Sequence, residues 1–311
     1  MIKQEQVYSG ELPVGEKLLI KKNVLQNGTS SKRVCIVTGT HGDELEGQYV
    51  AWKLGRYLKK RIHKLRGVVD IYPSLNSLGV STIERGLPGF DLDMNRIFPG
   101  NTESSANEYI AKKIVEDISG ADLAIDIHAS NIFLKEIPQI RINEKTADKL
   151  VPMAVHLNMD LIWVHSAATV LESTLAWSLN STGTPCLVVE MGVGMRLTKS
   201  YGDKLVAGIL ATMTHMGMLH EPLQPVYPPI ISSDGFVGYV NANQSGIFMP
   251  EKEHGSQVEE GEILGYVADP LTGIIREELR SPITGLLFTL REYPVVYSGS
   301  LIARVLGGAE E

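Results

Sequence analysis

The stretch 33-RVCIVTGTHGDELEG-47 decides the fold, because it joins an apolar run directly to a polar turn and then to a helix-like segment. The run over 33–38 is rich in Val and Ile, which is typical of a buried strand. The segment 44–60 then spaces its apolar residues for one face of a helix. The turn between them carries His41 and Glu44, which either begin the helix or form half of a metal site.

The same order of strand and helix recurs along much of the chain. Further apolar runs that predict strands lie at 67–73, 122–127 and 185–190, and helix-like segments lie at 103–118, 144–157, 170–181 and 197–217. Strands that alternate with helices predict an α/β domain with a largely parallel sheet.

A proline-rich segment divides the chain into two regions of different character. In 222-PLQPVYPP-229, four of the 15 prolines of the chain fall close together, which is typical of a stiff linker. Short strands with glycine turns follow, as in 246-GIFMP-250 and 281-SPITGLLFTL-290. We therefore expect an α/β domain over 1–220, a linker over 221–230 and a small all-β domain over 231–311.

Composition and charge exclude several classes of partner. The 311 residues include 29 basic and 36 acidic side chains, a net charge of −7 without a basic face, so nucleic acid is not an expected partner. Neither a signal-peptide core nor an apolar run of membrane-spanning length is present, so we expect a cytoplasmic protein that does not bind membranes. Cys35 and Cys186 lie in apolar runs and are expected to be buried thiols.

Potential metal ligands and acids follow three of the predicted strands. In open α/β sheets, ligands bind beyond the carboxyl ends of the strands. The first strand leads to His41 and Glu44, the run 122–127 leads to His128, and the run 185–190 ends in Glu190. Two imidazoles and one carboxylate with an open fourth position can hold a catalytic zinc. Glu190 could take a proton from the metal-bound water and pass it to a leaving group.

Each of these residues also has an ordinary structural interpretation. Glu44 could simply be an acid in the first turn of a helix, where the dipole favours it. Asp126 lies two residues before His128 and so shares its face of the strand, where it could orient a metal-bound histidine or make a cap or loop hydrogen bond. A Glu190 at the end of an apolar strand is harder to explain without a partner. Taken together, the residues favour a metal site.

The glycine- and proline-rich stretch 84-ERGLPGFDLDMNRIFPG-100 predicts a loop that carries polar side chains. An Asn-Arg pair, Asn95 and Arg96, suits a substrate carboxylate because guanidinium binds it through two parallel hydrogen bonds. A second arginine such as Arg85 could stabilise an oxyanion. The alternative is a surface loop with ordinary salt bridges.

In combination, HGDE, the NR-containing loop, DIH and VEMG resemble the succinylglutamate desuccinylase/aspartoacylase family, a branch of the zinc carboxypeptidase superfamily. The resemblance covers most of 31–305. It implies a zinc-carboxypeptidase-like mixed sheet flanked by helices, with a small C-terminal β domain. It implies one Zn²⁺ per chain, held by His41, Glu44 and His128. It further implies Glu190 as general base and acid, Arg85 as oxyanion stabiliser, and Asn95 with Arg96 as ligands of the substrate carboxylate.

Two features depart from the family pattern. The compact Asp-Leu-Asn-Arg motif of the family corresponds to 91-DLDMNRIFPG-100, in which the Asn-Arg pair lies further from Asp91. The tyrosine that the C-terminal domain of aspartoacylase lends to its site has only Tyr293 and Tyr297 as candidates. Arg141 and His165 are additional candidates for the site.

The resemblance implies hydrolysis of an amide, and the expected substrate is a small N-acyl amino acid or related carboxylate. A carboxypeptidase that trims short peptides is the alternative within the same class, and a non-catalytic small-molecule binding protein is a third hypothesis. The β domain also resembles barrel-sandwich modules of the biotinyl or lipoyl type, but 265-GYVADPLTGIIREEL-279 contains no lysine to carry a cofactor. We expect the domain to narrow the cleft entrance, and a homo-oligomer is possible.

Overall fold

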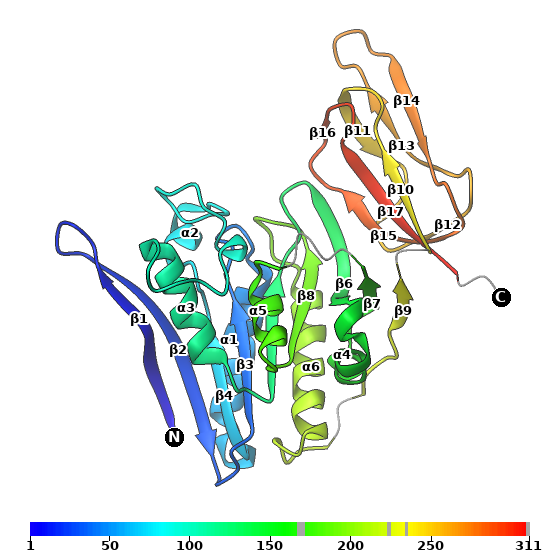
Figure 1. Cartoon of the computed structure of the whole chain (residues 1–311). Helices are drawn as coiled ribbons and strands as arrows, with labels where there is room; N and C mark the ends of the chain where they lie inside the picture. The colour runs from blue at the N-terminus through cyan, green and yellow to red at the C-terminus, as the bar shows by residue number, and fades with distance from the viewer. Residues whose placement is uncertain (167–171, 223–224, 234–235, 309–311) are drawn as a thin grey trace.

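The computed structural model describes residues 1–166, 172–222, 225–233 and 236–308. A large mixed sheet runs through the protein, with strand order β1-β2-β4-β3-β5-β8-β6-β15-β17-β10. Helices cover both of its faces in the first two thirds of the chain, and the described elements after residue 229 are strands (Figure 1). This arrangement confirms the predicted fold class.

Four parallel strands form the centre of the sheet, in the order β4-β3-β5-β8. They are the four strands predicted from the apolar runs: β3 (Arg33–Thr38), β4 (Gly67–Tyr72), β5 (Leu123–His128) and β8 (Cys186–Gly192). Their runs of Val, Ile and Leu are buried because helices pack on both faces, as parallel sheets require. Because the strands are parallel, the carboxyl ends of β3, β5 and β8 meet at one edge.

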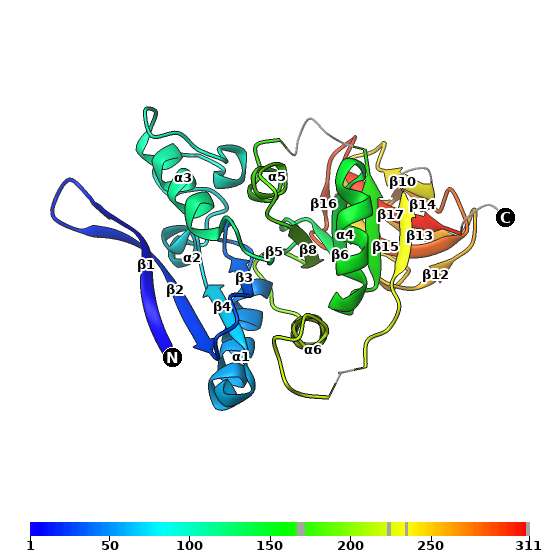
Figure 2. The same cartoon turned by 60° about the horizontal axis from the view of Figure 1, so that its bottom comes forward.

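Two separate cores flank the sheet, and Figure 2 shows the helices on its two sides. One core is built on α1 (Glu46–Lys60), α4 (Ala147–Ala154) and α6 (Lys199–His215), and the other on α3 (Ala106–Ile118) and α5 (Leu175–Ser181). The expected helices over 44–60, 103–118, 144–157 and 197–217 are confirmed, with differences of a few residues at their ends. Of the segment 170–181, residues 170 and 171 lie outside the described residues.

Several elements have no counterpart among the predicted ones. The N-terminal hairpin of β1 (Ile2–Glu11) and β2 (Lys17–Asn27) extends the sheet antiparallel to β4. Short helices also interrupt the loops, namely α2 (Ser77–Thr82) and the 3₁₀ turns η1 (Ile62–Lys64) and η2 (Met94–Arg96). The turns η3 (Glu144–Thr146) and η4 (Val155–Leu157) instead flank α4 within the helix-like segment predicted over 144–157. Turns this short leave no periodic apolar pattern.

Strand β6 (Leu134–Asn143) connects the α/β region to the C-terminal strands. It pairs with β8 and β7 (Leu161–His165), and its first residues pair with β15 (Gly285–Arg291). The strands β9 (Ile230–Ser233), β10 (Val237–Asn241), β12 (Gln257–Val258) and β17 (Leu301–Gly307) join the same sheet. A second sheet contains β11 (Gly246–Pro250), β13 (Ile263–Ala268), β14 (Ile275–Arg280) and β16 (Val295–Val296).

The C-terminal strands pack around a hydrophobic cluster of their own, which includes Phe248, Leu264, Leu287 and Val305. The division at 221–230 stays a prediction, since hydrogen bonds of one sheet also run from β6 into β15. No described helix is long and apolar enough to cross a bilayer.

Candidate active site

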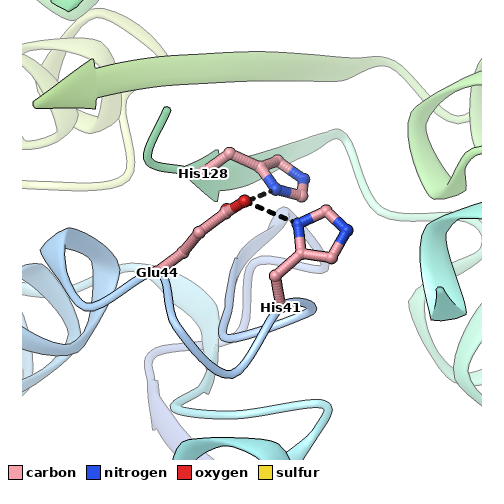
Figure 3. A group of neighbouring side chains, drawn as sticks. All are labelled: His41, Glu44 and His128. Atoms are coloured by element: carbon pink, nitrogen blue, oxygen red, sulfur yellow. Dashed lines mark hydrogen bonds and ion pairs between the residues drawn. The ribbon is translucent and has the colours of Figure 1, made fainter. Parts of the chain in front are cut away.

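His41, Glu44 and His128 meet at the carboxyl ends of β3 and β5 (Figure 3). The Glu44 carboxylate lies between the rings, with Oε1 2.7 Å from His41 Nδ1 and Oε2 2.9 Å from His128 Nδ1. One ligand atom from each residue lies within 4.8 Å of the others, and all three side chains are buried. This donor set fits a divalent transition metal, because imidazole nitrogens and a carboxylate suit zinc.

The far side of each imidazole contacts an aspartate. His41 Nε2 lies 2.9 Å from Asp93 Oδ1, and His128 Nε2 lies 3.1 Å from Asp126 Oδ2. Both Nδ1 atoms therefore face Glu44, and both Nε2 atoms face an acid. Metal-bound histidines usually donate their second N–H to such a carboxylate, which fixes the ring and its tautomer. The predicted pair of Asp126 and His128 is thus in contact, and Asp93 adds a second pair that the sequence did not reveal.

The carboxylates around the two imidazoles favour positive charge at this position. Burial by itself would raise the pKa of Glu44, but His128 and His41 hold it well below its ordinary value. Burial would likewise lower the pKa of both histidines, yet the surrounding carboxylates raise them above their ordinary values. A buried carboxylate that stays charged between two imidazoles is the arrangement that a metal ligand needs.

Glu190 lies beside His128, since the two residues are paired across β8 and β5. Its side chain is 16% exposed, and Arg141 Nη1 on β6 lies 3.4 Å from its Oε1. Burial raises the pKa of Glu190 above its ordinary value, with Arg141 opposing that shift. A carboxylate with a raised pKa beside a candidate metal site is suited to accept a proton and return it.

In the loop over 84–100, Asp93 is the acid that contacts the Asn-Arg pair. Asp93 Oδ1 accepts the backbone N–H of Asn95 at 2.8 Å and so begins the turn that contains Asn95 and Arg96. Asp93-Met94-Asn95-Arg96 has the spacing of an Asp-Leu-Asn-Arg motif, with methionine in place of leucine. Asp91, from which the longer spacing was counted, is exposed.

Three polar side chains of this loop line the same cavity as His41, Glu44 and His128. Asn95 is buried, and its Oδ1 accepts the backbone N–H of Leu175 at the start of α5, 3.0 Å away. Arg85 Nη1 donates to Glu44 Oε1 at 2.8 Å, and Arg96 lines the same cavity. The oxyanion role of Arg85 and the substrate role of Asn95 and Arg96 remain predictions.

One cavity of about 430 Å³ includes all eight predicted site residues. Arg141 and His165 also line it, whereas Tyr293 and Tyr297 are absent from its described lining and are 47% and 69% exposed. The C-terminal strands instead contribute Arg304, which approaches Glu136 of β6. An arginine inside the apolar strand 301-LIARVL-306 was the signal that could have revealed this residue.

The segment after β8 is attached by two contacts to the residues around Glu44, a candidate metal ligand. The Met195 N–H donates to the backbone oxygen of Asp43 at 2.7 Å, and the Thr198 N–H donates to the buried Glu46 carboxylate at 2.8 Å. Gly192 has a φ of +72°, and a Cβ there would lie 2.1 Å from Glu46 Oε1. Close packing at Gly192 therefore holds the strand that carries Glu190 against the turn that carries Glu44.

Residues 30–216 match the family model of the succinylglutamate desuccinylase/aspartoacylase catalytic domain. The chain belongs to this family. The match confirms the predicted family and the general class of activity, removal of an acyl group from an amino acid.

The similarity to three relatives extends over nearly the whole of this chain. An N-alpha-acetyl-L-2,4-diaminobutyric acid deacetylase from Halomonas elongata is 25% identical, over 92% of this chain and 85% of that protein. A succinylglutamate desuccinylase/aspartoacylase from Rhodobacter sphaeroides matches in structure with a TM-score of 0.84, 22% identity and coverage of 99% and 96% of the two chains. The product-bound ectoine utilization protein EutE (DoeB) from Ruegeria pomeroyi matches with a TM-score of 0.83, 20% identity and coverage of 99% and 95%.

Proposed function

We propose that this protein is a zinc-dependent hydrolase that cleaves the linear amide bond of a small N-acyl amino acid. The observation that carries the proposal is the buried group of His41, Glu44 and His128 beside Glu190, within one cavity. A Zn²⁺ bound there would lower the pKa of a water molecule and polarise the substrate carbonyl. The substrate is a small carboxylate. The protein functions in the cytoplasm.

Four residues of the cavity would bind the substrate, transfer the proton and stabilise the developing charge. Asn95 and Arg96 bind the carboxylate of the amino acid and so place the amide within reach of Glu190. Glu190 removes a proton from the attacking water and returns it to the leaving nitrogen. Arg85, which lies 41% exposed at the same cavity, stabilises the negative charge that develops on the carbonyl oxygen.

The two acids that contact the histidines act indirectly. Asp93 and Asp126 hold the rings of His41 and His128 so that both Nδ1 atoms face the metal position. Asp93 also fixes the backbone of Asn95, so one side chain aligns the metal ligand and the substrate-binding turn. The site is therefore arranged before substrate enters.

The size and lining of the cavity favour deacylation over peptide trimming. A volume of about 430 Å³ accommodates a small acylated amino acid, and Arg304 of β17 is part of the lining. A carboxypeptidase for short peptides would need an open groove for the preceding residues. A non-catalytic binding protein would give Glu190 no role in proton transfer, which disfavours that hypothesis.

Metal analysis with an activity screen tests the proposal. The purified protein should contain about one zinc per chain, and chelation should abolish hydrolysis that added zinc restores. N-acetyl and N-succinyl amino acids should be hydrolysed faster than dipeptides. Faster cleavage of dipeptides would favour the carboxypeptidase alternative, and a protein that neither binds zinc nor hydrolyses any amide would support the binding-protein alternative.

A further inference from the structure

We propose that the buried side chain of Glu46 is a positioning residue for Glu190, the proposed acid-base group. The inference rests on the proposed amide hydrolysis and adds to it a residue outside both the metal-ligand group and the described cavity lining. Glu46 is the first residue of α1, and its side chain is fully buried. It acts through the segment 192–198, which connects the end of β8 to the start of α6.

The carboxylate of Glu46 is directed to the start of α6. Both of its oxygens lie 2.8 Å from the backbone nitrogen of Thr198, the N-cap residue of that helix, whose own side chain makes no cap hydrogen bond. A buried carboxylate is costly unless donors satisfy it. Glu46 also lies at the N-terminal ends of two helices, α1 and α6, where the helix dipoles favour negative charge. One buried acid therefore joins the starts of both helices.

The same carboxylate contacts the end of β8. Gly192 is the last residue of this strand and follows Glu190 by two positions. Its φ is +72°, and a Cβ there would lie 2.1 Å from Oε1 of Glu46. Only a residue without a side chain lets the carboxylate approach the backbone so closely. Glu46 thus holds the segment 192–198 at both ends, by packing at Gly192 and by hydrogen bonding at Thr198.

Between these ends, the segment bridges the two loops that carry the candidate metal ligands. The Gly194 N–H donates at 3.2 Å to the backbone oxygen of Asn131, in the loop after β5, and the Met195 N–H donates at 2.7 Å to that of Asp43. Met195 has a φ of +59°, which is unfavourable for a residue with a Cβ. Such a conformation persists only while the surrounding contacts hold it. Loss of the Glu46 contact would let the segment relax and move the end of β8.

Glu190 is the reacting group most exposed to such a movement, because it lies on the same strand as Gly192 and only two residues before it. The candidate metal ligands depend less on the segment, since Asp93 and Asp126 also hold the two histidines. A misplacement of about 1 Å at a catalytic group can cost about 10²-fold in rate. Loss of the Glu46 acceptor should therefore lower the rate of the chemical step and leave the metal in place.

Glu46→Met removes both acceptor oxygens and keeps a side chain of similar length beside Gly192. For the N-acetyl amino acid that the wild type cleaves fastest, kcat should fall by roughly 10- to 100-fold while KM stays within about twofold. Glu46→Gln keeps one acceptor for the Thr198 N–H and should recover kcat to within about threefold of the wild type. Steady-state rates divided by the zinc content of each protein measure these effects.

Glu277→Met is the matched control for general destabilisation. The Glu277 carboxylate also accepts backbone N–H groups, those of Asn243 and Gln244 at 2.9 and 3.0 Å, and it lies outside the described cavity lining. This variant should lower the free energy of unfolding and leave kcat unchanged. A similar loss of kcat in Glu46→Met and Glu277→Met would show that destabilisation alone explains the effect, and it would overturn the inference.

A double variant separates positioning of Glu190 from any other role of Glu46. When Glu46→Met is added to Glu190→Gln, the residual kcat should fall by less than about twofold, because the group through which Glu46 acts is already disabled. A further loss as large as the one in the wild-type background would place the effect of Glu46 elsewhere. That outcome would overturn the inference and leave the proposed function standing.

Amide hydrogen exchange supplies a readout that does not depend on hydrolysis. The amides of Gly194, Met195 and Thr198 should exchange about tenfold faster in Glu46→Met than in the wild type and in Glu277→Met, since their acceptors are no longer held in place. Unchanged exchange across 191–198 would overturn the inference alone. Absence of any hydrolysis by the wild type, with faster exchange only in Glu46→Met, would instead remove the proposed function and support the anchoring of the segment by Glu46.

Discussion

A single oxygen of Asp93 lies 2.9 Å from His41 Nε2 and also accepts the backbone N–H of Asn95. The proposed metal ligand and the proposed substrate-binding turn are therefore aligned by one side chain. Burial raises the pKa of Asp93, but His41 and Arg85 outweigh it and hold that pKa at about 2. The carboxylate is thus charged at neutral pH.

Asp93→Asn removes this charge and keeps the shape of the side chain. We expect zinc affinity to fall by about 10- to 100-fold, because partners on the far side of a metal-bound histidine contribute that much. The apparent KM for carboxylate substrates should rise as well. Competition with a chromogenic chelator measures the affinity. Asp91→Asn, an exposed acid two residues earlier, is the control, and equal affinity in both variants would contradict the proposed alignment.

Glu190→Gln should separate proton transfer from metal binding. Loss of a positioned acid-base group lowers kcat by roughly 10²- to 10⁴-fold, whereas zinc content should stay near one per chain, because Glu190 is not among the three ligands. His128→Ala should instead remove the metal. Atomic absorption on the dialysed proteins, with steady-state rates, distinguishes the two. Loss of zinc from Glu190→Gln would show that Glu190 is itself a ligand.

The positions of the candidate metal ligands could be predicted because each follows an apolar run that is visible in the local sequence. Apolar runs fixed β3, β5 and β8, and the carboxyl ends of parallel strands must share an edge. His41, His128 and Glu190 follow those runs directly, so the general rule for parallel sheets was enough to place them near one another.

Glu136 and Arg304 could not be found in the same way. They are 168 positions apart in the sequence, and their contact depends on how β15 pairs with the start of β6. Pairing between such distant strands is set by tertiary packing rather than by local periodicity. The hairpin of β1 and β2 was missed for a related reason, since its strands are partly exposed and carry many charged residues.

Arg96→Ala should weaken binding of the substrate carboxylate. We expect KM for N-acyl amino acids to rise by roughly 10- to 100-fold, since a charge-assisted hydrogen bond is lost. The same substrates with the α-carboxylate converted to a primary amide provide the control, and the variant should treat them much as the wild type does. An unchanged KM for the free carboxylates would mean that Arg96 does not contact the substrate.

Gly192→Ala should destabilise the protein through two separate effects. The positive φ costs about 1–2 kcal/mol for any residue with a Cβ, and the clash with Glu46 adds roughly 1–3 kcal/mol. Gly183→Ala is the matched control, because its φ is +93° and no atom lies within 4 Å of the added Cβ. Urea unfolding of both variants measures the difference between their free energies of unfolding. An equal decrease in both variants would show that the Glu46 side chain moves aside without a cost in stability.

The two thiols should be inert in the folded protein. Burial raises the pKa of Cys35 to about 12 and that of Cys186 well above its ordinary value, and the side chains are 0% and 2% exposed. Because the thiolate is the reactive form, a disulfide reagent at pH 8 should label neither within minutes. Both should react after denaturation in guanidinium, which serves as the control. Cys186 lines the cavity, so rapid uptake of one equivalent by the native protein would show that the reagent reaches Cys186 through the cavity.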